Sequence, residues 1–311
     1  MKLFLGVDGG QSGTTALIGD ETGRILGQGT AGPCNHAAAG EGRAKLESAV
    51  RQSLASACLQ AGLDADTVHF AVACFGMSGG PDDKREILAA ILRSGSLLVT
   101  TDAVTALAGA TETGQGIVTI AGTGSIAFGR NAARRSVRAG GWGHVFGDEG
   151  GAFDIVRQAT RAALRVDEGW GPPTALRDAF LEATGSASAN EMLHRFYGDG
   201  WPRSRVAALA PVVDRAAAGG DGVALEILNG AAIQLAMLTG SVRGQLWKPG
   251  ERVDVAYVGG VFQSDLVRER FRLLIEMEPG CRCAPPLHGP ERGALLEAYR
   301  HVGLNPELRV S

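Results

Sequence analysis

The sequence lacks the patterns that mark disulfide-rich proteins, metal hydrolases and P-loop enzymes. Its 311 residues include five cysteines, an odd number without C-x-x-C spacing, so neither a disulfide framework nor a zinc site is indicated. We expect these cysteines to be small buried residues. The six histidines are scattered and no H-E-x-x-H occurs, which leaves metal-dependent hydrolysis without ligands. No G-x-x-x-x-G-K-[ST] motif is present, which excludes a P-loop mechanism.

Long apolar runs and a strong charge of one sign are also missing. No run approaches the ~20 residues of a membrane span, and MKLFLGVDGG reaches its glycines too early for a signal-peptide core. The net charge is -3, with acids and bases interspersed, so the basic footprint of a nucleic-acid-binding protein is absent. We therefore expect a cytoplasmic protein without a nucleic-acid or membrane partner.

The composition favours a globular chain with more than one domain. Hydrophobic residues make up 45% and charged residues 20%, and 311 residues are enough for two domains that each bury a core. The 46 glycines cluster in short groups after apolar runs. Such clusters indicate tight turns beside strands.

The most informative stretch runs from Leu97 to Phe128. It predicts a strand at Leu97–Thr100, an acid directly after it at Asp102, a short helix, and a strand at Ile117–Ala121 that opens into Gly122, Thr123, Gly124 and Ser125. A carboxylate at the end of a strand can take a proton, and a Gly/Thr turn leaves backbone N–H groups free for phosphate oxygens. We interpret the stretch as a phosphotransfer centre.

The N-terminus shows the same arrangement. Strands are predicted at Leu3–Val7, Thr14–Gly19 and Arg24–Gln28, and the loop that begins at Asp8 joins the first two. Because strand, glycine turn and strand recur at residues 119–130, we predict an internal duplication of βββαβα halves. Asp8 by itself could equally be a turn residue that hydrogen-bonds its own backbone.

Apolar periodicity predicts the remaining elements. Further strands are expected at Val68–Cys74 and Val253–Val258. Helices are expected at residues 41–61, 82–93, 152–164, 174–184, 189–197, 203–218, 223–246, 265–277 and 291–301. The helices between residues 168 and 250 carry no cluster of reactive side chains, and we interpret them as structural.

Two motifs suggest rival activities. Residues 76–80 satisfy G-x-S-x-G, the nucleophile elbow of α/β-hydrolases, but a further turn separates Ser78 from the predicted helix, whereas an elbow needs the helix at once. Residues 122–127 fit G-x-G-x-x-A, the dinucleotide fingerprint, but a short β-like segment follows in place of the helix that this site requires. Both rivals are disfavoured.

Three loops hold further candidates for the site. Asn35 lies in an irregular loop and is either a turn residue or a partner for a sugar hydroxyl. The loop at residues 140–151 contains Trp142, His144 and Asp148, of which Asp148 could cap the next helix and the other two could be packing residues. The paired glycines 259 and 260 would let a flat ring approach the backbone.

Taken together, eight motifs in register resemble the N-acetylglucosamine kinases of the BadF/BadG/BcrA/BcrD branch of the actin-like ATPase superfamily. They are GVDGGQSGTT, CNH, GMSGG, TTDA, AGTGS, GGWGHVFGDEGG, VGGVF and PPLHGPERGA. The resemblance implies an α/β fold of two actin-like, RNase H-like domains with duplicated βββαβα cores and an interdomain cleft. We expect one domain at residues 1–113, against which residues 291–311 pack back, and a second at residues 114–290 with a helical insertion.

The resemblance also implies roles for individual residues. ATP phosphates would meet Asp8, Gly9, Gly10, Ser12, Gly13, Thr14 and Thr15 in a first loop, and Gly122, Thr123, Gly124 and Ser125 in a second, with Gly259 and Gly260 at the adenosine. Asp102 would deprotonate the 6-hydroxyl of N-acetylglucosamine. The sugar would lie near Asn35, Ser78, Gly79, Asp102, Gly141, Trp142 and Asp148. Asp8, where some relatives carry Glu, would organise Mg²⁺, and a homodimer is the family expectation.

The sequence leaves the sugar open. Glucosamine and N-acetylmuramic acid are the alternatives, because one contact at C2 or C3 can decide among these substrates. The same branch contains ATPases that activate radical dehydratases through a shared iron–sulfur cluster, but no cysteine lies between Cys74 and Cys281 to hold one. A zinc-bearing hexokinase would need more cysteines than Cys281 and Cys283, and a non-catalytic sugar sensor would carry an added helix-turn-helix, which we do not expect here.

Overall fold

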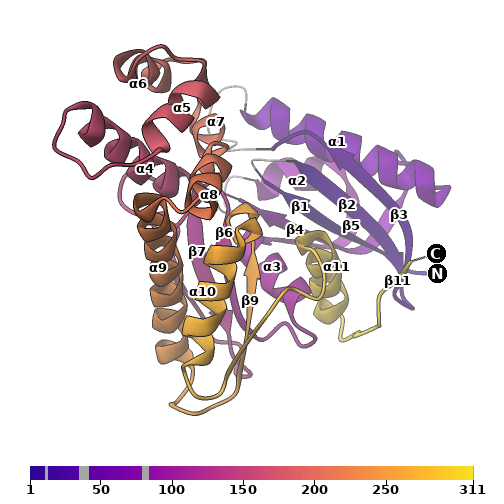
Figure 1. The fold of residues 1–311 in the computed structure, drawn as a ribbon. Coiled ribbons are helices and arrows are strands. Elements are labelled where there is room, and N and C mark those ends of the chain that lie inside the picture. The colour runs from indigo at the N-terminus through magenta and orange to yellow at the C-terminus, as the bar shows by residue number, and fades with distance from the viewer. Residues whose placement is uncertain (11–12, 35–41, 79–83, 311) are drawn as a thin grey trace. The chain divides into compact units, whose positions relative to one another are not determined.

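A computed structural model describes residues 1–10, 13–34, 42–78 and 84–310 of the chain. The chain forms two compact units (Figure 1). Unit 1 combines Met1–Gln115 with Pro286–Ser311, and unit 2 is Gly116–Pro285. Each unit contains a mixed β-sheet.

The sheet of unit 1 has the strand order β11-β3-β2-β1-β4-β5. An antiparallel meander of three strands forms its centre, and β4 and β5 extend it in parallel on the other side of β1. The strands are β1 (Leu3–Gly9), β2 (Thr14–Asp20), β3 (Arg24–Ala31), β4 (His69–Met77), β5 (Arg93–Thr101) and β11 (Arg309–Val310). Parallel pairing places the carboxyl ends of β1, β4 and β5 at the same edge of the sheet.

Helices cover both faces of this sheet (Figure 1). Leu5 and Val7 of β1 pack with the apolar face of α1 (Gly42–Ala61), whereas Phe4 points to the other face and packs with Tyr299 of α11 (Pro290–His301). A sheet that is buried on both faces needs apolar residues on both sides of each strand. This requirement explains the continuous apolar run at the N-terminus.

Two glycines let α11 approach closely within unit 1. A Cβ at Gly6 of β1 would overlap the backbone of Leu295 in α11, and a Cβ at Gly293 would overlap the backbone of Thr105 in α3 (Asp102–Ala110). Any larger residue at either position would push the helix away. The C-terminal helix is therefore an integral layer of the N-terminal unit.

The sheet of unit 2 repeats this topology. Its order is β10-β9-β6-β7-β8, in which an antiparallel meander is again extended by two parallel strands beside its first strand. The strands are β6 (Gly116–Ala121), β7 (Ser125–Arg130), β8 (Ser136–Gly140), β9 (Val253–Val258) and β10 (Cys281–Ala284). The predicted duplication of the core is confirmed.

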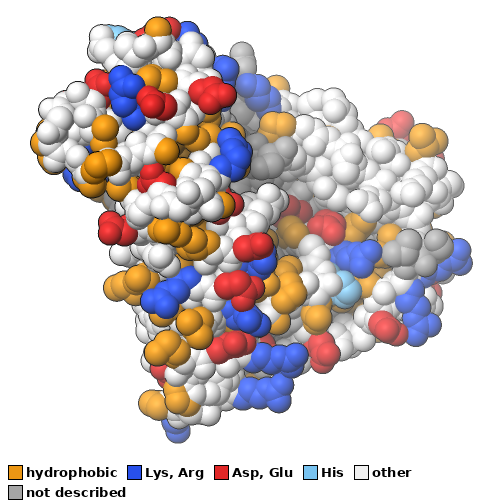
Figure 2. All heavy atoms as spheres, viewed as in Figure 1, with side chains coloured by type: hydrophobic (Ala, Val, Ile, Leu, Met, Phe, Trp, Pro, Cys, Tyr) orange, Lys and Arg blue, Asp and Glu red, His pale blue; other side chains and the backbone are white. Residues whose placement is uncertain are grey.

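The helices of unit 2 surround one apolar core. They are α4 (Ala152–Asp167), α5 (Leu176–Thr184), α6 (Ala189–Tyr197), α7 (Arg203–Ala207), α8 (Ala210–Ala218), α9 (Gly222–Leu246), α10 (Asp265–Glu276) and the 3₁₀ turn η1 (Gly260–Gln263). Acidic and basic side chains alternate over α10 (Figure 2), where Arg272 pairs with Glu269 at 3.0 Å. This mixture of acidic and basic side chains agrees with the small net charge of -3.

Helix α9 is, among the described residues, long and apolar enough to cross a membrane by length and composition. Its Leu235 and Val242 are fully buried in the core of unit 2. Its Thr239 hydroxyl hydrogen-bonds the Thr119 hydroxyl of β6 at 2.6 Å. One face of the helix therefore packs against the core of unit 2.

The structure corrects two predicted helices. The helix expected at residues 203–218 is broken into α7 and α8, with Pro211 in the first turn of the second helix, where its missing N–H is tolerated. The helix expected at residues 82–93 is described only from Arg85 to Ile91, and Arg93 already belongs to strand β5. Strand β10 was not predicted.

Candidate functional site

The acidic residues of unit 1 gather at the carboxyl edge of its sheet. Asp8 of β1 lies beside Gly76 of β4, which in turn lies beside Thr100 of β5. Asp102 follows β5 directly and is the first residue of α3. A threonine of α3, Thr105, fills the space where Gly76 has no side chain, which draws the start of this helix onto the sheet.

The carboxylate of Asp102 is held through one of its two oxygens. Oδ1 accepts a hydrogen bond from the backbone N–H of Ala103 at 2.9 Å, while Oδ2 accepts none from the described residues, and the side chain is half-buried. Burial raises the pKa of Asp102, and this rise is opposed by the Ala103 N–H group and by the Lys84 ammonium. The hydrogen bond from Ala103 orients the carboxylate at the end of β5.

Asp8 faces other acids. Burial raises the pKa of Asp8 to about 7, and the neighbouring carboxylates of Asp102 and Glu291 add to the rise. Across the hairpin, Asp8 pairs with Thr15 in register. A cation bound beside Asp8 would reduce the repulsion between its carboxylate and those of Asp102 and Glu291.

The first glycine turn connects β1 and β2. Gly10 donates its N–H to Gly13 at 3.0 Å and has open space where a side chain would be, whereas the back of Gly9 is closed by Cys34 and Met77. Thr14 is buried and its hydroxyl donates to the carbonyl of Gly32 at 2.9 Å, so this side chain has a structural role.

Of the four remaining candidates of unit 1, only Ser78 lies within the described residues. Ser78 lies at the end of β4 and donates its N–H to the carbonyl of Gly9 at 3.1 Å. Helix α2 is described from Arg85, and residues 79–83, which decide whether a helix follows Ser78 directly, lie outside the described part of the chain. Ser12, Asn35 and Gly79 lie outside the described residues, and their roles stay predictions.

The second glycine turn connects β6 and β7 in unit 2. Gly122 donates its N–H to the carbonyl of Gly124 at 2.9 Å and has open space beside it. The Ser125 hydroxyl donates to the carbonyl of Glu149 at 2.6 Å, and the carbonyl of Thr123 accepts the N–H of Phe153 at 3.1 Å. Strand β7 begins at Ser125, where a dinucleotide-binding site would need a helix. The interpretation of residues 122–127 as a dinucleotide fingerprint is therefore wrong.

The paired glycines lie beside this second turn. Gly259 has a φ of 112° and its Cβ position would overlap the carbonyl of Ala121, the last residue of β6. The end of β6 can therefore pack against residue 259 only when that residue is glycine. Gly260 has open space and leaves its backbone accessible.

Asp148 is not the cap of helix α4, because that position is held by Gly151. Its carboxylate lies against Gly124, where Oδ1 accepts the N–H of Ser125 at 3.3 Å and Oδ2 accepts from the Arg203 guanidinium at 2.7 Å. The side chain is buried. Asp148 thus contacts the second turn directly.

Two other residues of this loop, Gly141 and Trp142, are both exposed. Gly141 donates its N–H to the carbonyl of Ser125 at 2.9 Å and has a φ of 71°. Trp142 is exposed, with the Arg138 guanidinium 4.9 Å from its ring centroid. An exposed indole held by a cation is a surface on which a sugar ring can stack.

Comparison with known proteins covers both units of the chain. A family model for the BadF/BadG/BcrA/BcrD ATPases matches residues 5–298. The chain belongs to the BadF/BadG/BcrA/BcrD ATPase family. The resemblance inferred from the motifs is confirmed.

Similar proteins match this family member along almost its whole length. An N-acetylmuramic acid/N-acetylglucosamine kinase from Clostridium acetobutylicum is 31% identical over 285 residues, which cover 89% of this chain and 91% of that protein. An N-acetyl-D-glucosamine kinase from Dictyostelium discoideum is 28% identical over 319 residues, which cover 96% and 98%. A crystal structure from Chromobacterium violaceum, provisionally assigned as an N-acetylglucosamine kinase, has a TM-score of 0.79 at 27% identity, covering 95% of this chain and 98% of that one.

A more distant structure shows the fold alone. The ROK family glucokinase from Streptomyces griseus has a TM-score of 0.57 at 19% identity, covering 96% of this chain and 99% of that one. The shared fold agrees with the predicted α/β architecture of actin-like sugar kinases. Family membership makes ATP the nucleotide to be tested at the two glycine turns.

The residues of unit 1 fit a magnesium ion of the kind that accompanies ATP. Mg²⁺ is usually held by one or two carboxylates, with water and substrate phosphates completing its shell. Among the described residues no group of three or more His, Cys, Asp or Glu side chains forms a closed metal cage. The acidic surroundings of the partly exposed Asp8 suit the open kind of site.

Three charged residues near the turns were missed from the sequence. Lys84 is fully buried just before α2, Glu291 lies in the first turn of α11, and Arg203 lies in α7. Glu291 belongs to the PPLHGPERGA motif, which was a usable signal. Lys84 and Arg203 lie in segments predicted as ordinary helices, so no local pattern could have found them.

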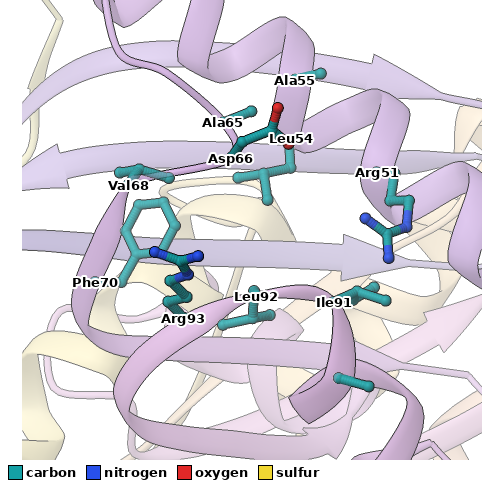
Figure 3. A pocket seen from close by; sticks show the side chains of 11 residues that line it. Arg51, Leu54, Ala55, Ala65, Asp66, Val68, Phe70, Ile91, Leu92 and Arg93 are labelled. Carbon is teal, nitrogen blue, oxygen red and sulfur yellow. The ribbon is translucent and has the colours of Figure 1, made fainter.

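Unit 1 also has a cavity of about 340 Å³ that is distant from Asp102. Arg51 and Arg93 lie on opposite sides of it, with Leu54 and Leu92 between them (Figure 3). Arg93 begins β5 and Asp102 follows its end, so roughly 25 Å of strand separates this cavity from the acid. We assign the cavity no part in the site.

Proposed function

We propose that this protein transfers the γ-phosphoryl group of ATP to the 6-hydroxyl of N-acetylglucosamine, with Asp102 as the general base. The observation that carries the proposal is the position of Asp102 at the sheet edge that also carries Asp8 and the first glycine turn, with one of its oxygens oriented by the Ala103 N–H. The relatives named as amino-sugar kinases support the substrate class. N-acetylmuramic acid is the second candidate, because one relative is named for both sugars.

The proposed reaction balances in one displacement. The sugar O6 forms a bond to the γ-phosphorus while the bond from that phosphorus to the β,γ-bridging oxygen breaks, and the hydroxyl proton passes to Oδ2 of Asp102. The products are the sugar 6-phosphate and ADP. Phosphoryl transfer needs little covalent chemistry from the protein, so the residues mainly orient the reactants and stabilise charge.

Each glycine turn would contribute backbone N–H groups to the phosphates. Gly10 and Gly122 have open space beside them, so phosphate oxygens can approach the main chain. Asp8 would hold Mg²⁺, which when bound supplies positive charge to the phosphates. Trp142 and Ser78 are proposed to lie beside the sugar.

The test is a coupled assay of ADP release with a panel of sugars. N-acetylglucosamine, N-acetylmuramic acid, glucosamine and glucose are compared at equal concentration, and the product is analysed by phosphorus–proton correlation NMR. We expect the highest kcat/KM with N-acetylglucosamine and phosphate on C6. ADP release that is independent of every amino sugar, or phosphate on C1, would exclude the proposed reaction.

A further inference from the structure

A single arginine of the helical segment reaches the second glycine turn. Arg203 is the first residue of α7, and its guanidinium Nη2 donates to Oδ2 of Asp148 at 2.7 Å. The side chain of Asp148 is 7% exposed and that of Arg203 is 29% exposed. The pair is therefore largely removed from water. In such buried surroundings, neither charge is stable without the other.

Asp148 transmits this contact to the turn. Its other oxygen, Oδ1, accepts the N–H of Ser125 at 3.3 Å, and the carboxylate occupies the space left by the missing side chain of Gly124. Asp148 has a φ of 63°, a left-handed conformation that is uncommon for residues other than glycine and that Asp adopts more readily than most. The ion pair, the hydrogen bond from Ser125 and a backbone hydrogen bond from the Gly151 N–H to the Asp148 carbonyl at 3.0 Å hold it there.

A second contact links Arg203 to the same turn. The guanidinium lies 5.9 Å from the ring centroid of Phe153, a cation–π distance. Phe153 belongs to the first turn of α4 and donates its N–H to the carbonyl of Thr123 at 3.1 Å. Arg203 is thus connected to Thr123 through Phe153, and to Ser125 through Asp148.

We propose that Arg203 is a positioning residue that holds the turn Gly122–Ser125 in the geometry that receives the nucleotide phosphates. This inference rests on the proposed phosphotransfer function. Backbone N–H groups bind an anion well only when their directions are fixed in advance. Without the guanidinium the buried Asp148 carboxylate would lack its counter-charge and would turn toward water, and the turn would lose its support.

The experiment compares Arg203→Met with Arg205→Met. Arg205 is in the same short helix, where it donates to the carbonyl of Gly200 and stacks on Trp201, so it is a matched control. For Arg203→Met we expect kcat/KM for ATP to fall by about 10- to 100-fold, the scale of a misaligned anion site. The values for Arg205→Met should stay near those of the wild type. Because Asp148 is also expected beside the sugar, the KM for the sugar can rise in Arg203→Met, but by less than kcat/KM for ATP falls.

A double-mutant cycle separates positioning from general damage. In an Asp148→Asn background no buried charge needs Arg203, so the further loss from Arg203→Met should be several-fold smaller than in the wild type. Thermal unfolding without ligand is measured alongside. If Arg203→Met does not fold, Arg203→Gln, which keeps an N–H donor and removes the charge, takes its place.

The outcomes are distinct. An unchanged kcat/KM for ATP in folded Arg203 variants overturns the inference, and so does a loss confined to the KM for the amino sugar, which would place Arg203 at the sugar. Full additivity in the cycle also overturns it. If the wild-type protein phosphorylates no amino sugar, the proposed function has failed, and ATP binding by calorimetry then tests Arg203 independently.

Discussion

Replacing Asp102 by Asn removes the proposed base and almost nothing else. The contact between Oδ1 and the N–H of Ala103 can persist, because an amide oxygen accepts the same hydrogen bond at 2.9 Å. The start of α3 and its packing on Gly76 through Thr105 are therefore retained. What changes is the outer atom, which becomes an NH₂ group that cannot accept a proton.

The magnitude follows from this difference. General-base catalysis contributes about 10²- to 10⁴-fold, so kcat should fall by about 100-fold or more, equivalent to about 2.7 kcal/mol or more of transition-state stabilisation. The sugar KM should change little, since an amide can still hydrogen-bond a hydroxyl. Removal of a buried, repelling charge beside Asp8 should leave the folded protein at least as stable as the wild type.

The assay measures kcat by ADP release and sugar binding by calorimetry on the same preparations. Asp66→Asn, an equal charge change at an exposed position of unit 1, is the control and should behave as the wild type. A kcat within a few-fold of the wild type in Asp102→Asn would refute the assignment of the base. Loss of sugar binding together with kcat would instead make Asp102 a binding residue.

Three further changes test the surrounding structure. Gly124→Ala places a methyl group against the Asp148 carboxylate, so kcat/KM for ATP should fall by about tenfold or more while the sugar KM is retained, as measured by steady-state kinetics. Tyr299→Phe removes the 2.7 Å hydrogen bond to the buried Asp20 carbonyl and should lower the free energy of unfolding by about 1 kcal/mol in urea titrations; an unchanged midpoint would contradict this. Burial lowers the pKa of His288, so the unfolded chain binds the extra proton first and stability should decline as pH falls below about 6.5. His288→Asn should flatten that decline in melting curves between pH 7 and 5, and an identical slope in both proteins would exclude His288 as the cause.

The strands at the centre of both units could be predicted because their residues face apolar surroundings on both sides. Leu5 and Val7 pack toward α1 and Phe4 toward α11, so the run is apolar throughout and needs no knowledge of its partners. The glycine turns were equally visible, since few other residues allow the backbone of a turn to approach a ligand. The break at Ala208–Leu209 between α7 and α8 was missed, because the apolar spacing continues across it.

The sequence by itself determined the duplicated α/β core, the acid after β5 and the position of both glycine turns. These depend on local pattern, on residues that are neighbours in the chain or in a hairpin. Only the tertiary structure decided that Asp148 braces the second turn, and that Arg203, 55 residues further along, completes this contact. An ion pair between a loop and a distant helix is set by how the helices pack around the core, and no periodicity in the chain records it.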